Sequence, residues 1–421
     1  MDLTRDAAAA LDASDPLAGF RSRFTGTEDD GGDGLLYLDG NSLGRLPRDT
    51  PAALTRVVEE QWGRGLIGSW ASWIGEATRI GDVLADGVLG ACPGEVLVGD
   101  STSVNLYKLL VAAIGARPGR DVVVCTADDF PTDRYIVAGV AEAQGMTVRE
   151  LPADIDEGLD PATLAAALDE RVAVVVLSHV AYRSGAKADL AAITRQARDV
   201  GALVLWDLSH SVGSVPVELA AAEADLAVGC TYKYLNGGPG SPAFLYVRRE
   251  LQDELRSPIR GWFGHRDQFA MGPAYEPAAG IERFGVGTPP VLASAAVEVG
   301  ARLVAEAGIG RLAENGSALT DLAIALGDEW LAPHGVTLAS PREAARRGSH
   351  VTFFHPAAWQ VTQALIDNGV VPDFRTPDRV RLGPAPLYTR FVDVWDGMDR
   401  FRALLEDGSF ERYPAERARV T

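Results

Sequence analysis

Lysine is the residue type that this 421-residue sequence most clearly lacks. It occurs only as Lys108, Lys187 and Lys233, and apart from the histidines every other basic side chain is arginine. Arginine stays charged, whereas a desolvated lysine loses its proton and condenses with carbonyl groups. A lysine that this chain retains is therefore a candidate for amine chemistry, although an ordinary lysine in a turn is the simpler interpretation.

Cysteine is equally scarce, and Cys92, Cys125 and Cys230 form no metal-spaced pair. This spacing predicts no metal site and fits a reducing compartment. The net charge of −19 argues against nucleic acid or an anionic membrane as partner. No apolar run approaches the length of a membrane span, and no basic leader precedes an apolar core at the N-terminus. We therefore expect a cytoplasmic protein.

The chain is long enough for a large domain and a smaller one. From Glu95 onward, short apolar strands alternate with helical segments, which predicts an α/β domain with a mainly parallel sheet. A polar, mobile loop is expected at residues 25–34, and an alanine-rich helix from Val291 leads into a smaller α+β unit. We predict a large domain of residues 51–290, with residues 1–50 and 291–421 forming an N-terminal arm and a small C-terminal domain. The strands expected in the large sheet are Glu95–Asp100, Asp121–Cys125, Val172–Leu177, Ala202–Trp206, Ala224–Cys230 and Pro242–Val247.

Polar residues follow several of these strands, at the sheet edge where ligands of open α/β sheets bind. Ser178 and Asp207 each end an apolar run, and Lys233 follows the next strand. A lysine and an acid at one edge are what pyridoxal phosphate needs, the acid keeping the ring nitrogen protonated. The helix that starts at Thr102 and Ser103 could seat a phosphate. Helix caps explain Asp207 and these hydroxyls equally well.

Seven short motifs then occur in one order along the chain. They are Gly40-Asn-Ser-Leu-Gly44, Phe130-Pro-Thr-Asp133, Asp207-Leu-Ser-His210, Tyr232-Lys-Tyr-Leu-Asn236, Gly261-Trp-Phe-Gly-His265, Gly287-Thr-Pro-Pro290 and Pro384-Ala-Pro-Leu-Tyr388. Together they resemble the kynureninases, which are fold-type-I pyridoxal phosphate enzymes of the aminotransferase superfamily. The resemblance implies an α/β fold with a large, mainly parallel seven-stranded sheet, a smaller α+β domain, and a homodimer with shared active sites.

The resemblance also assigns roles. Lys233 matches the lysine that binds the cofactor and moves protons, Asp207 the partner of the ring nitrogen, and Tyr232 a phosphate ligand. Because Tyr232 is expected near both the cofactor phosphate and the substrate, we also expect it to act as the acid–base group in the later proton transfers. Trp262 and Thr288 match residues that reach the phosphate from the partner subunit. The implied cofactor-binding residues are Thr102, Ser103, Phe130, Asp133, Ser178, Asp207, His210, Tyr232, Lys233, Trp262 and Thr288.

The implied reaction is hydrolysis of the Cβ–Cγ bond of L-kynurenine to anthranilate and L-alanine. Arg381 lies in an apolar run and matches the arginine that pairs with the substrate carboxylate, although a surface arginine on a strand would give the same pattern. The implied substrate-binding residues are Asn41, Ser42, Trp70, Phe263, Thr288 and Arg381.

Trp70 and Thr288 resemble the bacterial members, which prefer kynurenine to 3-hydroxykynurenine. An indole leaves less room and fewer hydrogen-bond partners for an added ring hydroxyl. The alternatives are a 3-hydroxykynurenine-preferring hydrolase of secondary metabolism, another fold-type-I enzyme such as a cysteine desulfurase or an epimerase, and a non-catalytic scaffold. A desulfurase needs a nucleophilic cysteine on a mobile loop, whereas all three cysteines here lie in or beside helix or strand patterns.

Overall fold

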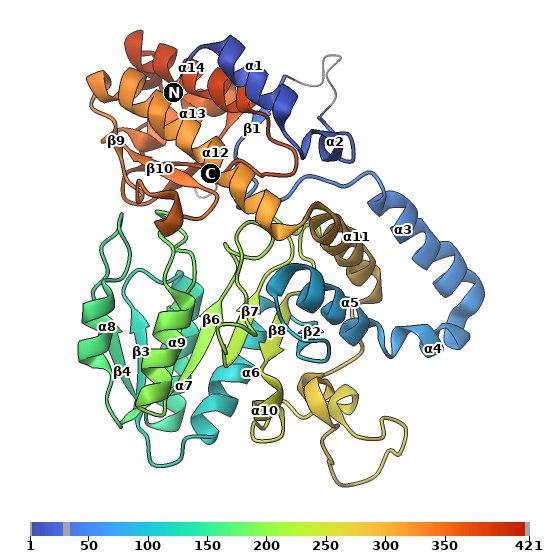
Figure 1. Cartoon of the computed structure of the whole chain (residues 1–421). Helices are drawn as coiled ribbons and strands as arrows, with labels where there is room; N and C mark the ends of the chain where they lie inside the picture. Colours follow the sequence, from blue (N-terminus) through green and yellow to red (C-terminus); the bar gives the residue numbers. More distant parts are fainter. Residues whose placement is uncertain (1, 28–33, 417–421) are drawn as a thin grey trace.

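The computed structural model describes residues 2–27 and 34–416. Most of the polar loop expected at residues 25–34 lies outside the described residues. Within the described part, no helix is long and apolar enough to cross a membrane. The first helix, α1 (Arg5–Ser14), packs against α14 (Phe391–Glu406) within the smaller group of strands and helices (Figure 1).

A seven-stranded sheet forms the centre of the larger part of the molecule (Figure 1). Its order is β2-β8-β7-β6-β5-β3-β4, and β8 alone runs antiparallel to its neighbours. The predicted mainly parallel sheet of an α/β fold is thus confirmed. The strands are β2 (Val96–Val98), β3 (Val122–Thr126), β4 (Thr147–Leu151), β5 (Val172–Ser178), β6 (Leu203–Asp207), β7 (Leu226–Gly229) and β8 (Phe244–Val247).

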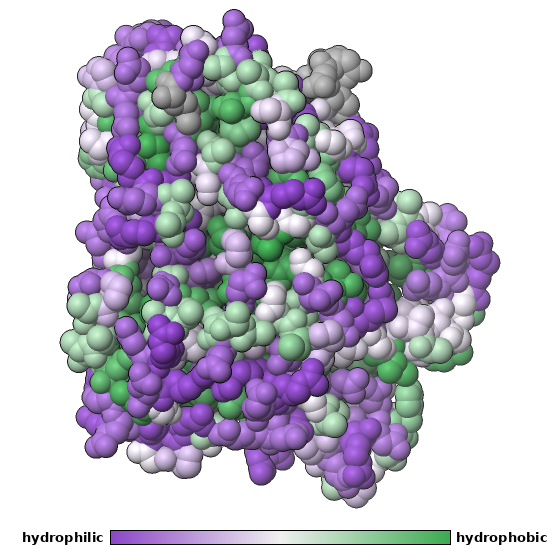
Figure 2. All heavy atoms as spheres, in the orientation of Figure 1, coloured by the Kyte–Doolittle hydropathy of each residue, from purple (hydrophilic) through white to green (hydrophobic). Residues whose placement is uncertain are grey.

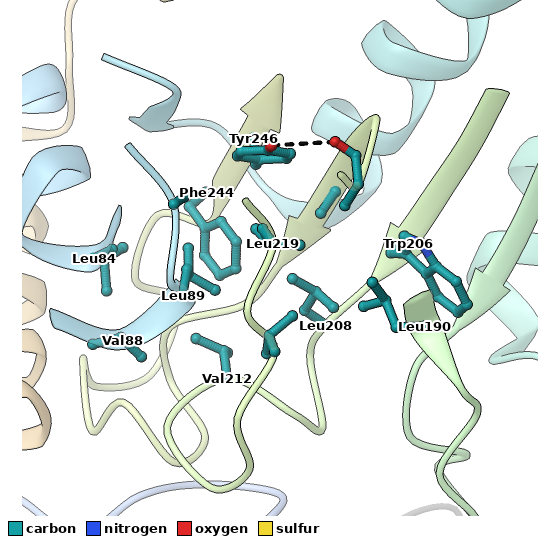
Figure 3. Packing of buried hydrophobic residues seen from close by; sticks show 14 of the residues in the cluster. Leu84, Val88, Leu89, Leu190, Trp206, Leu208, Val212, Leu219, Phe244 and Tyr246 are labelled. Atoms are coloured by element: carbon teal, nitrogen blue, oxygen red, sulfur yellow. Dashed lines mark hydrogen bonds between the residues drawn. The ribbon is translucent and has the colours of Figure 1, made fainter. Parts of the chain in front are cut away.

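Helices cover both faces of this sheet, and its central strands are therefore buried on both sides. Successive residues of β8 point to opposite faces: Phe244 and Tyr246 pack in one hydrophobic cluster, Leu245 and Val247 in the other. Figure 3 shows the first of these clusters, in which the Tyr246 hydroxyl donates to a backbone carbonyl. One face is covered by α6 (Thr102–Gly115), α7 (Pro131–Gln144) and α10 (Arg249–Gln252), the other by α5 (Glu76–Leu84), α8 (Pro161–Ala167), α9 (Leu190–Asp199) and α11 (Val291–Ala307).

A smaller antiparallel sheet, ordered β12-β13-β10-β9, packs with helices against a third hydrophobic cluster. Both ends of the chain contribute to this cluster, and β1 (Leu36–Tyr37) pairs in parallel with β11 (Val370–Val371). The domain boundaries proposed from the sequence stay a prediction. The other elements here are α1 (Arg5–Ser14), α2 (Ala18–Arg21), β9 (Thr337–Leu338), β10 (Val351–Phe354), β12 (Asp373–Arg375), β13 (Arg379–Leu382), α12 (Ile309–Leu326), α13 (Ala358–Asp367) and α14 (Phe391–Glu406).

An arm stands away from the large sheet and carries α3 (Thr50–Arg56) and α4 (Trp70–Trp73) (Figure 1). Between these helices the chain forms a π-helix over Val57–Gly65 and a short 3₁₀ helix over Leu66–Ser69. The face of the molecule seen in Figure 2 is mostly hydrophilic, with hydrophobic residues gathered in the hollows between hydrophilic ridges. The arm differs, because Trp62, Leu66 and Ile67 are all more than half exposed.

Candidate active site

The carboxyl ends of β5, β6 and β7 lie side by side in the large sheet. The parallel register of β5 with β6 sets Ser178 opposite Asp207, and β7 pairs with β6 on its other side. A cavity of about 340 Å³ opens at this edge. The predicted cofactor-binding residues that line it are Thr102, Ser103, Phe130, Asp133, Ser178, Asp207, His210, Tyr232 and Lys233.

Lys233 contacts a histidine inside this cavity. Its Nζ lies 2.9 Å from Nε2 of His210, and its ammonium end is 5.9 Å from the ring centre of Tyr232. Burial, and then the nearby lysine, hold the pKa of His210 well below its ordinary value. The imidazole is therefore neutral, and Nε2 accepts a hydrogen bond from the lysine. Burial raises the pKa of Tyr232, so its hydroxyl is protonated at neutral pH and available as an acid.

Asp207 and Asp133 form a buried pair of carboxyl groups. Asp207 accepts hydrogen bonds from the backbone N–H of Ser209 at 2.9 Å and from its hydroxyl at 2.6 Å. Burial, and then the charge of Asp207, raise the pKa of Asp133 well above its ordinary value, and the two side chains share a hydrogen bond. Asp133 is therefore the protonated member that donates, and Asp207 is the member that carries the negative charge.

Asp129 is close enough to this pair to act on the charge of Asp133, and it holds two strand ends together. Its Oδ2 accepts from the backbone N–H of Thr126 at 2.8 Å, and its Oδ1 accepts from that of Ser178 at 2.9 Å. These bonds join the ends of β3 and β5, and they fix the position of Ser178 at the cavity. Asp129 was not predicted as a site residue.

The helix α6 points its first turn at the cavity. Ser101 caps this helix by accepting from the backbone N–H of Val104 at 3.3 Å. Because Ser101 fills the cap position, the hydroxyls of Thr102 and Ser103 are free of that role. The first turn of a helix offers unpaired N–H groups and the positive end of the dipole, and both favour a phosphate.

The fully buried Lys108 links this turn to a distant loop. Its Nζ lies 2.7 Å from Asp100 Oδ2 and donates to the carbonyl of Phe284 at 2.9 Å. Asp100 lines the cavity and has a positive φ of 51°, a conformation that non-glycine residues rarely adopt. Lys108 thus holds Asp100 in place and ties α6 to the segment that precedes Thr288.

Arg381 is completely buried at the junction between the small sheet and the N-terminal segment. Its guanidinium contacts the carboxylate of Asp373 and lies 2.8 Å from the Ser42 hydroxyl. The side-chain amide of Asn41, with its oxygen toward Arg381, accepts from Nε at 3.0 Å. The alternative interpretation of Arg381 as a surface arginine is therefore wrong. The structure brings together Asn41, Ser42 and Arg381, three of the predicted substrate-binding residues.

The remaining predicted residues lie apart from this cavity within one chain. Trp70 packs against Trp262 and Phe263, with ring centres 5.6 and 6.0 Å apart. Neither this aromatic cluster nor Thr288 lines the cavity of the same chain. The sequence-based expectation that Trp262 and Thr288 reach a partner's site stays a prediction.

The groups around the cavity fit pyridoxal 5′-phosphate. Lys233 is placed for the aldehyde, Phe130 for stacking on the ring, and the first turn of α6 for the phosphate. Among the described residues, no basic side chain forms an ion pair with the buried carboxylate of Asp207. That carboxylate therefore suits a protonated ring nitrogen. The described residues contain no group of histidine, cysteine and carboxylate side chains placed to hold a metal ion.

Comparisons with known proteins agree with this geometry. The family model "Kynureninase C-terminal domain" matches residues 312–401. A kynureninase of Pseudomonas fluorescens is 46% identical over 411 residues, covering 96% of each chain. A kynureninase of Burkholderia pseudomallei is 45% identical, covering 99% of this chain and 100% of its own.

Solved structures show the same fold at low sequence identity. A cysteine desulfurase from Thermococcus onnurineus superposes with a TM-score of 0.81 at 19% identity, covering 93% of this chain and 98% of its own. A cystine lyase variant with glycine linked to pyridoxal phosphate gives 0.77 at 20% identity, covering 92% and 99%. These likenesses establish the fold-type-I architecture, whereas the relatives of about 45% identity identify the family. This chain belongs to the kynureninase family, and its cofactor is pyridoxal 5′-phosphate.

Proposed function

We propose that this protein hydrolyses L-kynurenine to anthranilate and L-alanine. The observation that carries the proposal is the placement of Lys233 and Asp207 at one cavity, in a chain 46% identical to a kynureninase over nearly its full length. The bound cofactor supplies an electron sink that stabilises negative charge on substrate carbon. Anthranilate fluorescence after addition of L-kynurenine tests the proposal.

The chain's own residues divide the work of binding and proton transfer. Arg381 binds the substrate α-carboxylate, and Lys233 removes the proton from Cα. Asp207 would stabilise positive charge at the ring nitrogen, while protonated Asp133 donates a hydrogen bond to the Asp207 carboxylate. Tyr232 supplies and accepts protons in the later steps, because its hydroxyl is protonated and lines the same cavity. Water contributes the oxygen of the new anthranilate carboxylate and the hydrogen that ends on the methyl carbon of alanine.

We propose kynurenine rather than 3-hydroxykynurenine as the preferred substrate. Trp70 does not line the cavity of its own chain, so this proposal requires that the dimer proposed below brings its aromatic cluster to the partner's site. Trp73, Trp262 and Phe263 hold Trp70 in that cluster, so its indole is not easily displaced by a larger substrate ring. The ratio of kcat/KM on the two substrates tests this preference. A Trp70→His variant should shift the ratio toward 3-hydroxykynurenine, because histidine offers room and a hydrogen-bond partner for the hydroxyl.

We also propose a homodimer with shared active sites. The arm exposes Trp62 and Ile67, and the loop after the aromatic cluster exposes Phe269 and Met271 at 60% and 75%. Exposed apolar surface of this kind is typical of protein interfaces. A second copy seated there would bring Trp262 toward its partner's cavity. Mixing inactive Lys233→Ala with impaired Trp262→Ala protomers should then restore activity through one intact site per dimer, and activity that stays lost would contradict shared sites.

A cysteine desulfurase is the second candidate, because solved structures of desulfurases share this fold. Burial raises the thiol pKa of Cys230, and raises that of Cys125 to about 12, so neither is a ready nucleophile. Cys92 is exposed but does not line the cavity. Release of sulfide from L-cysteine at a rate comparable with anthranilate formation would favour this candidate.

We also propose a cytoplasmic location, because all three cysteines are free.

A further inference from the structure

The guanidinium of Arg381 already has a negatively charged partner inside the protein. Asp373 lies directly across from it in the antiparallel pairing of β12 with β13, and the two side chains are in contact. Asp373 is 3% exposed and Arg381 is fully buried, so water screens this pair very little. A buried pair of one cation and one anion is neutral overall. On its own it would attract a substrate carboxylate only weakly.

A second guanidinium changes this charge balance. Arg375 lies two residues after Asp373 on the same strand, so both side chains leave the same face of the sheet. Its Nη2 is 2.7 Å from Asp373 Oδ2, the same oxygen that contacts Arg381. Its Nε is buried and has no hydrogen-bond partner among the described residues. Two arginines therefore share one carboxylate.

A further carboxyl group, that of Asp39, lies 4.0 Å from the Arg381 guanidinium. Burial, and then Asp373, raise the pKa of Asp39 to about 7, so it is largely neutral below that pH. Burial, and then Arg381, lower the pKa of Arg375 to about 10, which leaves it charged at neutral pH. With Asp39 protonated, the cluster of Arg381, Arg375 and Asp373 carries one net positive charge.

We propose that Arg375 is a positioning residue for substrate binding. By sharing Asp373 with Arg381, it gives the buried cluster the one net positive charge that a substrate α-carboxylate needs. The inference rests on the proposed function only in taking that carboxylate to bind at Arg381. Tyr182 supports the placement, because it lines the cofactor cavity, packs edge-on against Phe130 and offers its backbone carbonyl to Arg381.

The test compares Arg375→Gln, Arg375→Lys and a control, Arg342→Gln. Arg342 is exposed and pairs with Asp328 on the surface. Its replacement by glutamine therefore removes the same positive charge, but away from the cavity. Arg375→Gln should raise KM for kynurenine about 10- to 100-fold with little change in kcat, since the interaction lost is a charge-assisted one. Arg375→Lys, which keeps the charge, should recover most of this loss, and the control should behave as wild type.

A binding measurement separates the charge effect from a folding defect. L-Alanine and the decarboxylated analogue of kynurenine are titrated into each holoenzyme while the cofactor absorbance is recorded. Arg375→Gln should weaken L-alanine as much as it raises KM, and it should leave the analogue's affinity unchanged. Equal weakening of both ligands, or wild-type affinity for L-alanine, would overturn the inference. Because L-alanine binding is measured directly, the outcome is independent of whether kynurenine is turned over.

Discussion

We predict that Asp133 acts on Asp207 as a hydrogen-bond donor, and two substitutions of Asp133 test this role. In Asp133→Asn an amide N–H replaces the acidic O–H and still donates to Asp207, whereas in Asp133→Leu the donor is lost. Both groups are about 95% buried, so no water takes over. A hydrogen bond to a charged buried group contributes about 1.5–3 kcal/mol. The leucine variant should therefore bind pyridoxal phosphate about 10- to 150-fold more weakly, and the asparagine variant nearly as well as wild type.

The same pair determines a pH dependence of stability. Because the pKa of Asp133 is raised on folding, the folded chain binds one more proton than the unfolded chain above about pH 3.9. The free energy of unfolding from this group therefore falls as pH rises, by up to about 1.4 kcal/mol per unit, until the raised pKa is passed. Asp133→Asn has no such proton, so its stability should fall less steeply.

Two measurements check this reasoning. The dissociation constant of pyridoxal phosphate is determined for the wild type and both variants from the cofactor absorbance. Urea unfolding of the apoproteins is then followed between pH 5 and pH 8, a range in which Asp39 and Glu76, with pKa values of about 7, contribute equally to all three proteins. An asparagine variant that loses as much affinity as the leucine variant would refute the assignment of Asp133 as the donor. An unchanged pH slope would refute its protonation.

Three further predictions concern the lysines and Asp39. Lys233→Ala should abolish turnover and the absorbance of the lysine-bound cofactor, as measured by spectroscopy and anthranilate release. Lys108→Met should leave the buried Phe284 carbonyl without its donor and Asp100 without its partner, which lowers stability by about 1–3 kcal/mol in urea unfolding; a wild-type midpoint would contradict this. KM for kynurenine should rise as pH increases through about 7, because ionised Asp39 adds a negative charge beside the Arg381 site; a KM independent of pH from 6 to 8 would contradict the charge count.

Much of the large sheet could be predicted from the sequence, because its central strands are continuous apolar runs. The run Val172–Leu177 forms β5 over Val172–Ser178, and Ala202–Trp206 forms β6 over Leu203–Asp207. The edge strand β4 was not predicted, since Thr147–Leu151 is largely exposed and has no apolar run. The antiparallel direction of β8 also could not be foreseen, because a strand buried on both faces has the same pattern in either direction.

Site residues at strand ends and in specific motifs could be predicted, and the structure places most of the predicted cofactor-binding residues around one cavity. The partners that tune them were missed. Asp373 and Arg375 contact Arg381 only because β12 and β13 pair in one register. Lys108 reaches Phe284 across 176 positions of chain. Such contacts depend on tertiary packing and leave no local pattern, although the burial of a charged residue in an apolar helix, as at Lys108, is a signal that such a partner exists.

The central claim is that this chain cleaves kynurenine with Lys233 as its proton-transfer group. In the most direct test, the purified protein is loaded with pyridoxal phosphate and incubated with L-kynurenine, and anthranilate and L-alanine are both measured. The Lys233→Ala variant is the control. The account predicts equal amounts of both products from the wild type and none from the variant. Absence of anthranilate from a wild-type protein that binds the cofactor, or equal product formation by Lys233→Ala, would contradict it.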